Sequence, residues 1–178
     1  MKGKIMSDIK YRVPVIAQSR TMSCWAAATA MLMSWKRGFM VTEEEAARLA
    51  GNNFLIAFRQ NQGVTGAEIA ELAVQLALTA EPPSSHTSAS YRSLLASKGP
   101  LWVGTAIFST TATYRHVRIL SGIRGPEGDP DPVLDIIDPD GGRSYGASVS
   151  HFALELEEIA RQDLGAGQEL RPQIIHYP

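Results

Sequence analysis

The chain has 178 residues, of which 44% are hydrophobic and 20% are charged, and its 17 Lys and Arg against 18 Asp and Glu give a net charge of −1. Nucleic-acid binding needs clustered Lys and Arg, so this balance excludes it as the main function. No apolar run approaches the roughly 18 residues that a membrane span needs. Because a chain of this length buries about 70% of its unfolded surface, we expect a single domain over residues 1–178.

The sequence contains one cysteine, Cys24. A single thiol excludes an intramolecular disulfide and a Cys-rich zinc site, and we expect neither a metal nor a cofactor. A lone cysteine is most often a small buried side chain without chemistry. The residues around Cys24 therefore decide whether it is structural or reactive.

Residues 24–36 predict a helix that is buried on every side, because its apolar residues leave no polar face. Thr21 or Ser23 is expected to cap the start of this helix, and Gly38 to end it. Three more helices are expected: one from the capping pair Thr42 and Glu45 to Gly51, one from Thr65 and Glu68 along the stripe Ile69, Leu72, Ala73 and Leu76, and one over 90–98 that ends at Gly99.

After Pro100 the apolar residues alternate instead. Runs rich in β-branched and aromatic residues predict strands at 101–108, 116–120, 133–137, 143–149 and 174–177, while segment 151–171 fits either a strand or a helix. Helices followed by strands predict an α+β fold, with a helical part at about 20–98 that packs against a sheet part at about 99–178.

Cys24 would begin the predicted central helix, where free backbone N–H groups and the helix dipole favour a thiolate. A cysteine nucleophile also needs a histidine base and a third group that orients the imidazole. His116 is the strongest of four histidines, because it opens a strand after a polar loop. The weaker ones are His86 in a solvated Ser- and Thr-rich connector, His151 after a strand, and His176 near the C-terminus, where chain ends fray.

Two more polar residues complete the predicted site. Asp138 ends the strand that follows His116, so antiparallel pairing would bring its carboxylate to the ring, whereas Asp135 would face the other side of the strand. The alternative interpretation is structural: Asp138 would stabilise a turn before Pro139. Gln18, six residues before Cys24, could donate with the Cys24 backbone N–H to the oxyanion of a tetrahedral intermediate.

Four sequence features occur in a fixed order along the chain. They are the stretch VPVIAQSRTMSCWAAATAMLMSW, the predicted strand GPLWVG, His116 and Val117 before ILSGI, and the sequence IIDPDGG. This set resembles the papain-like cysteine proteases, in particular the small bacterial branch typified by a type III effector protease of plant pathogens. The resemblance covers about residues 11–39 and 99–142. It implies a papain-like fold in which Cys24, His116, Asp138 and Gln18 hydrolyse peptide bonds in a protein or peptide substrate.

The sequence departs from papain in having Met22 and Ser23 before the nucleophile, Asp as the third member, and Arg118 where the family tends to be apolar. Trp25 is expected to shield the thiol and the imidazole from water as well as to belong to the core. No pro-segment fits before Cys24, so the resemblance implies that an immunity or inhibitor protein, a host activating factor or the delivery route restrains activity.

Other functions remain compatible with the same residues. A thiol and an imidazole also serve amidases, including those that cut peptidoglycan, deamidases and acyltransferases. A catalytically silent papain-like binding module and a helical protein with a merely buried cysteine are the non-enzymatic alternatives. Without a readable Sec signal, we expect synthesis in the cytoplasm, and the resemblance to effectors implies delivery into a target cell by a specialised secretion system.

Overall fold

The all-round apolar segment after Cys24 forms helix α1, Cys24–Arg37, in the computed structural model, which describes residues 8–178. Ten consecutive side chains, from Trp25 to Ser34, are buried. Gly38 ends the helix in a left-handed conformation (φ 75°) and donates its N–H to the Ser34 carbonyl. The predicted burial and C-terminus of this helix are therefore confirmed.

The predicted N-terminal cap of α1 is wrong. Ser23 occupies the cap position, but its side chain accepts no hydrogen bond from the helix. Its hydroxyl instead donates to the buried carboxylate of Glu43 at 2.7 Å, and the Thr21 hydroxyl accepts from Asn61. Both side chains serve contacts with residues distant in sequence, which a local capping pattern does not register.

Four further helices precede the main strands: α2 (Glu43–Ala50), α3 (Asn52–Arg59), α4 (Gly66–Gln75) and α5 (Ser88–Lys98). Thr65 and Glu68 form the complete predicted capping box of α4, and the Thr42 side chain accepts from the Glu45 N–H as expected. Helix α3 was not predicted. It begins directly after Gly51, so the glycine separates two helices rather than ending the helical segment.

The strands form one antiparallel sheet in the order β2-β7-β3-β4-β5-β6, and β1 pairs with β4 beside the end of β3. The predicted strands are all present, and the bounds differ most for the predicted strand 116–120, which extends over Thr113–Arg124. The two short strands β1 and β2 come from the first half of the chain and were not predicted. The strand bounds are β1 Ile9–Lys10, β2 Thr79–Ala80, β3 Leu101–Phe108, β4 Thr113–Arg124, β5 Val133–Asp138, β6 Arg143–Ser148 and β7 Ile174–His176.

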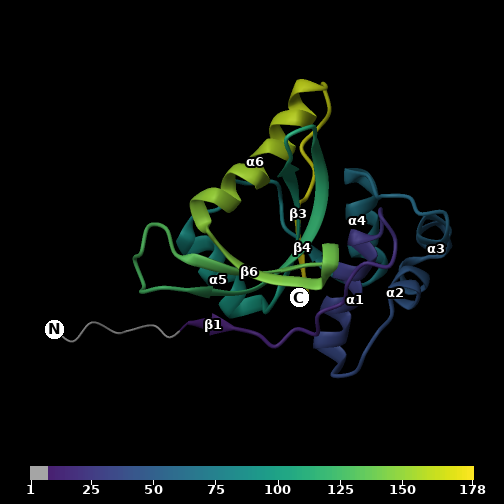
Figure 1. Ribbon diagram of the computed structural model, residues 1–178, viewed down its shortest axis with the longest axis horizontal. Helices are drawn as coiled ribbons and strands as arrows, with labels where there is room; N and C mark the ends of the chain where they lie inside the picture. Colours follow the sequence, from purple (N-terminus) through teal and green to yellow (C-terminus); the bar gives the residue numbers. More distant parts are fainter. Residues whose placement is uncertain (1–7) are drawn as a thin grey trace.

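The middle of the sheet is buried on both faces, since helices α1 to α4 lie on one side of it and α5 lies on the other (Figure 1), whereas the edge strand β6 is mostly exposed. Side chains alternate between the two faces along each strand. On β3, Trp102 joins the core formed with α1, whereas Leu101 and Val103 join the core on the opposite face. This helix and sheet arrangement is the expected α+β fold.

The ambiguous segment 151–171 is mainly helix α6, Val149–Gly165, which covers the same face as α5. Phe152 and Leu156 are buried, four residues apart as in a helix, whereas Leu154 is 62% exposed. Strand-like alternation at these three positions is therefore coincidental. Among residues 8–178, no helix is both long and apolar enough to cross a membrane.

Candidate active site

Cys24 is the first residue of α1 and is half-buried. The loop that leads to it is held by the buried Glu43, whose carboxylate accepts from the Ser19 backbone N–H at 3.0 Å and from the Ser23 hydroxyl at 2.7 Å. Glu43 belongs to the first turn of α2. The packing of α2 against α1 therefore fixes the loop that leads to the thiol. No sequence pattern indicated this role for Glu43.

A second anchor for the same loop is Asn61, which follows α3. Its side-chain oxygen accepts from the Met22 backbone N–H at 2.9 Å, and its amide donates to the Thr21 hydroxyl at 2.9 Å. Asn61 has a left-handed backbone (φ 55°), a conformation that asparagine tolerates better than most residues. Beside it, the Trp25 indole N–H donates to the Gln62 carbonyl at 3.1 Å. These contacts join the Cys24 loop to the end of α3.

His116 and Asp138 lie side by side on neighbouring strands. The His116 Nε2 and the Asp138 Oδ1 are 2.6 Å apart, and the two residues are 6% and 4% exposed. Asp138 Oδ1 also accepts from the Asp140 backbone N–H at 2.9 Å. Asp135, on the other side of β5, accepts instead from Arg124. The structure thus brings together the histidine and the aspartate that strand alternation had selected.

This contact changes the protonation of both groups. Burial alone would lower the pKa of His116, but its interactions with Asp138 and Cys24 outweigh burial and raise the pKa to about 9. Burial disfavours the charged form of Asp138 too, which for a carboxylate means a higher pKa, but hydrogen bonds from His116 and the Asp140 N–H lower the pKa of Asp138 below its usual value. At neutral pH the pair is therefore an imidazolium and a carboxylate.

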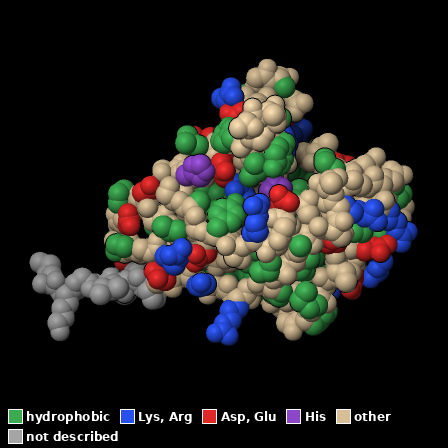
Figure 2. All heavy atoms as spheres, viewed as in Figure 1, with side chains coloured by type: hydrophobic (Ala, Val, Ile, Leu, Met, Phe, Trp, Pro, Cys, Tyr) green, Lys and Arg blue, Asp and Glu red, His purple; other side chains and the backbone are tan. Residues whose placement is uncertain are grey.

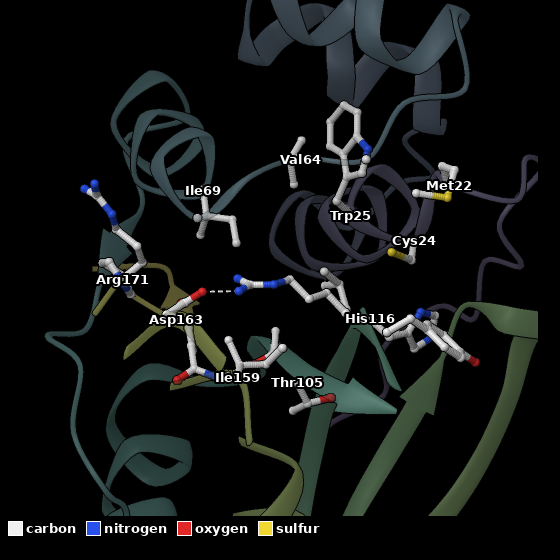
Figure 3. A pocket seen from close by; sticks show the side chains of 18 of the residues that line it. Met22, Cys24, Trp25, Val64, Ile69, Thr105, His116, Ile159, Asp163 and Arg171 are labelled. Atoms are coloured by element: carbon white, nitrogen blue, oxygen red, sulfur yellow. Dashed lines mark hydrogen bonds and ion pairs between the residues drawn. The ribbon is translucent and has the colours of Figure 1, made fainter. Parts of the chain in front are cut away.

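Cys24 and His116 face each other across one cleft. Figure 3 shows Cys24 at the end of the α1 ribbon and His116 on the strand below it, and both residues line the same cavity. Because Asp138 binds Nε2, the ring nitrogen left for the thiol is Nδ1. Trp25 also lines this cavity although it is buried in the core.

Gln18 belongs to the loop before Cys24, and its backbone joins this loop to the residue after Asp138, because the Gln18 N–H donates to the carbonyl of Pro139 at 2.8 Å. Its side-chain Nε2 donates to the carbonyls of Arg20 and Thr21 at 2.9 and 3.0 Å. The side-chain oxygen of Gln18 is buried and has no hydrogen-bond partner within the described part of the chain. The structure thus holds Gln18 in the loop before Cys24, with both amide hydrogens directed at carbonyls.

The remaining histidines have other contacts. His151 is exposed on α6 and lies 3.7 Å from Glu155. His86 is half-buried rather than solvated, and Ser84 and Ser90 flank its ring nitrogens. The expectation that His176 lies in a frayed end is wrong: it is fully buried in β7, with its Nε2 2.7 Å from Glu81. Pairing of β7 with two other strands fixes this end of the chain.

Arg118, unexpected at its position, lies on the same face of β4 as His116, two residues farther along. It is 2% exposed. Its guanidinium donates to Glu155 of α6, to Thr105 of β3 and to the Tyr145 hydroxyl. The buried charge is thus paired, and the contacts join α6 to the strand that carries His116.

The cleft between Cys24 and the sheet has a volume of about 370 Å³. Apolar side chains from α1, α4, β4 and α6 and the loop before α4 form most of its walls, and an ion pair between Arg115 and Asp163 lies in it. Figure 2 shows acidic and basic side chains interspersed over the face in view. Within residues 8–178, no three His, Cys, Asp or Glu side chains are grouped so that they could hold a metal ion.

The chain matches the model of a known protein family. The family described as papain-like cysteine protease AvrRpt2 matches residues 4–157. The matched span contains Gln18, Cys24, His116 and Asp138, but it ends before Asp163 at the far end of the cleft. Comparison with curated proteins gives no match.

Proposed function

Since the chain belongs to the papain-like cysteine protease AvrRpt2 family, we propose that it cleaves peptide bonds with Cys24 as nucleophile, His116 as acid and base, and Asp138 as the group that orients the imidazole. Membership of the family supports a cysteine peptidase acting on protein. The observation that carries the residue assignment is the buried pair of His116 and Asp138, 2.6 Å apart, facing the cleft that Cys24 also lines.

In this proposal the Cys24 thiolate attacks the carbonyl carbon of the scissile peptide bond. The His116 imidazolium then gives its Nδ1 proton to the leaving amine, which departs and leaves an acyl group on the sulfur. A water molecule, deprotonated by the now neutral His116, hydrolyses the thioester. Asp138 keeps the ring in one orientation through both steps, because its carboxylate holds Nε2.

The oxyanion of the tetrahedral intermediate needs hydrogen-bond donors. We assign this role to the Cys24 backbone N–H, which lies at the free end of α1, and to the Gln18 side-chain amide. The Gln18 amide donates to the carbonyls of Arg20 and Thr21, so one of these hydrogen bonds must be exchanged for the oxyanion during the reaction.

The test is hydrolysis of a peptide library by the wild-type protein and by Cys24→Ala, with cleaved bonds identified by mass spectrometry. A matched control is Ser97→Ala, which removes an exposed hydroxyl on α5. Cleavage that Cys24→Ala abolishes and Ser97→Ala retains supports the proposal. Cleavage that persists in Cys24→Ala refutes it.

Two further measurements separate the other candidate functions. If the protein cleaves a muropeptide mixture but no peptide, its function is that of an amidase rather than a peptidase. The second measurement is the rate of Cys24 alkylation by iodoacetamide as a function of pH. In a catalytically silent module, this rate would rise with the ionisation of an ordinary thiol, with the midpoint of the rise at about pH 8.5. A peptidase that uses an imidazolium and a thiolate should react rapidly well below that pH.

A further inference from the structure

The far end of the cleft is built partly by residues beyond the span that matches the family, which ends at residue 157. Ile159 and Asp163 come from the second half of α6, and Arg171 from the segment that follows it. Ile69 of α4 and Arg115 of β4 line the same cavity. The part of this wall that α6 and the segment after it supply thus lies outside the matched span, whereas Ile69 and Arg115 lie within it.

Asp163 is a buried carboxylate in this wall. Its side chain is 4% exposed and forms an ion pair with Arg115, whose side chain is 44% exposed. Both residues of the ion pair line the cleft, and Figure 3 shows the guanidinium of Arg171 pointing away from Asp163. Arg171 lies 3.6 Å from Glu169, which is exposed. Arg115 is therefore the cation that covers Asp163 on the side of the cleft.

The position of Asp163 in the helix makes this cover important. It lies in the last turn of α6, which ends at Gly165, where the helix dipole disfavours a negative charge. A buried carboxylate without a partner is costly. If Arg115 were removed, the carboxylate would therefore attract any cation that reaches the end of the cleft.

We propose that the ion pair of Arg115 and Asp163 determines which substrate side chain the cleft accepts. Paired, the two charges cancel, and the apolar walls around Ile69 and Ile159 accept an uncharged side chain close to the scissile bond. Either charge alone would select a substrate of the opposite charge. This assignment rests on the proposed peptidase function, which it extends to the substrate class.

The experiment compares peptides that differ at a single position near the scissile bond, with Leu, Lys or Glu there, and scans each flanking position in turn. The variants are Arg115→Met, Asp163→Asn and their combination, and Arg161→Met is the matched control because Arg161 is an exposed ion-pair residue of the same helix. Selectivity is the ratio of kcat/KM for the Lys or Glu peptide to that for the Leu peptide. A ratio is used because Arg115 neighbours His116 and its replacement changes the rate as well.

Wild type should favour Leu over both charged residues at one position. Arg115→Met should raise the Lys to Leu ratio there by about 10- to 100-fold, in line with the coupling of close charge pairs at interfaces. Asp163→Asn should raise the Glu to Leu ratio instead, the double variant should lose both gains, and Arg161→Met should resemble wild type.

The same peptides are also titrated against each variant in the Cys24→Ala background, so that selectivity is measured without catalysis. If no peptide is hydrolysed but the binding ratios change as described, the proposed function fails and the selectivity assignment stands. Unchanged ratios in Arg115→Met and Asp163→Asn, or a double variant that keeps the Lys preference, overturn the assignment, as does the absence of binding to every peptide. Asp163→Asn is nearly isosteric, and circular dichroism establishes that each compared variant is folded.

Discussion

Replacing Asp138 by Asn should reduce activity much more at neutral than at acidic pH. The carboxylate and Cys24 keep the pKa of the buried His116 at about 9, against an ordinary value of 6.5. At about pH 7.5 nearly every ring is then charged, whereas a ring whose pKa returned to 6.5 would be charged in only about a tenth of molecules. We therefore expect kcat/KM to fall by about tenfold from protonation alone near pH 7.5, and by more once the ring is less well oriented.

The assay is kcat/KM from about pH 5 to 10 for wild type and Asp138→Asn. The basic limb of the profile should lie near 9 in wild type and should move to lower pH in the variant. A variant whose basic limb stays near that of wild type would refute this account of the His116 charge, whatever its absolute rate.

The same shift predicts how stability depends on pH. Because the pKa of His116 is higher in the folded protein, the imidazolium stabilises the fold fully below about pH 6.5, and this contribution is lost as the pH rises through about 9. The difference between the two pKa values corresponds to about 3 kcal/mol in the free energy of unfolding. Urea unfolding across this range should show a smaller decline in Asp138→Asn, whereas equal declines in the two proteins would contradict the reasoning.

Three further substitutions test the packing around the site, each by urea unfolding. Glu155→Ala leaves Arg118 buried without its carboxylate and should lower the free energy of unfolding by about 3–5 kcal/mol; a loss below about 1 kcal/mol would show that water replaces the carboxylate. Gly122→Ala would place a Cβ 2.3 Å from the Ile9 carbonyl oxygen, so β1 should separate from β4, and an unchanged stability would contradict this. Thr65→Ala removes half of the capping box of α4 and should cost about 1 kcal/mol, with no loss expected if water caps the helix equally well.

The helices that could be predicted have strong local signals, and the one that was missed does not. Helix α1 follows from an unbroken apolar segment, and α4 from a capping box. Helix α3 follows Gly51 and begins with two asparagines, and both residue types are poor helix formers. It is stabilised instead by Phe54 and Phe58, which are buried in the core with α1. Tertiary packing therefore outweighs propensity in α3.

The candidate site divides in the same way. Cys24, His116 and Asp138 were selected from positions at element ends and from strand alternation, and the structure brings His116 to Asp138 as that pattern predicts. The supports of the site were not foreseen. Glu43 holds the loop before Cys24 although its position in the sequence suggested only the first turn of a helix.

The sequence by itself determined the local geometry: which segment forms the buried central helix, where the thiol stands on it, and which aspartate faces the histidine. These features follow from the 3.6- and 2-residue periods of helix and strand, which act over neighbouring residues. Only the tertiary structure decided what lines the cleft. Arg115 and Asp163 are 48 residues apart, and no local period relates them, so their ion pair exists only because α6 packs on the sheet. The lone cysteine could therefore be selected from the sequence as the candidate nucleophile, whereas the side chain that we propose its cleft accepts depends on contacts that exist only in the folded chain.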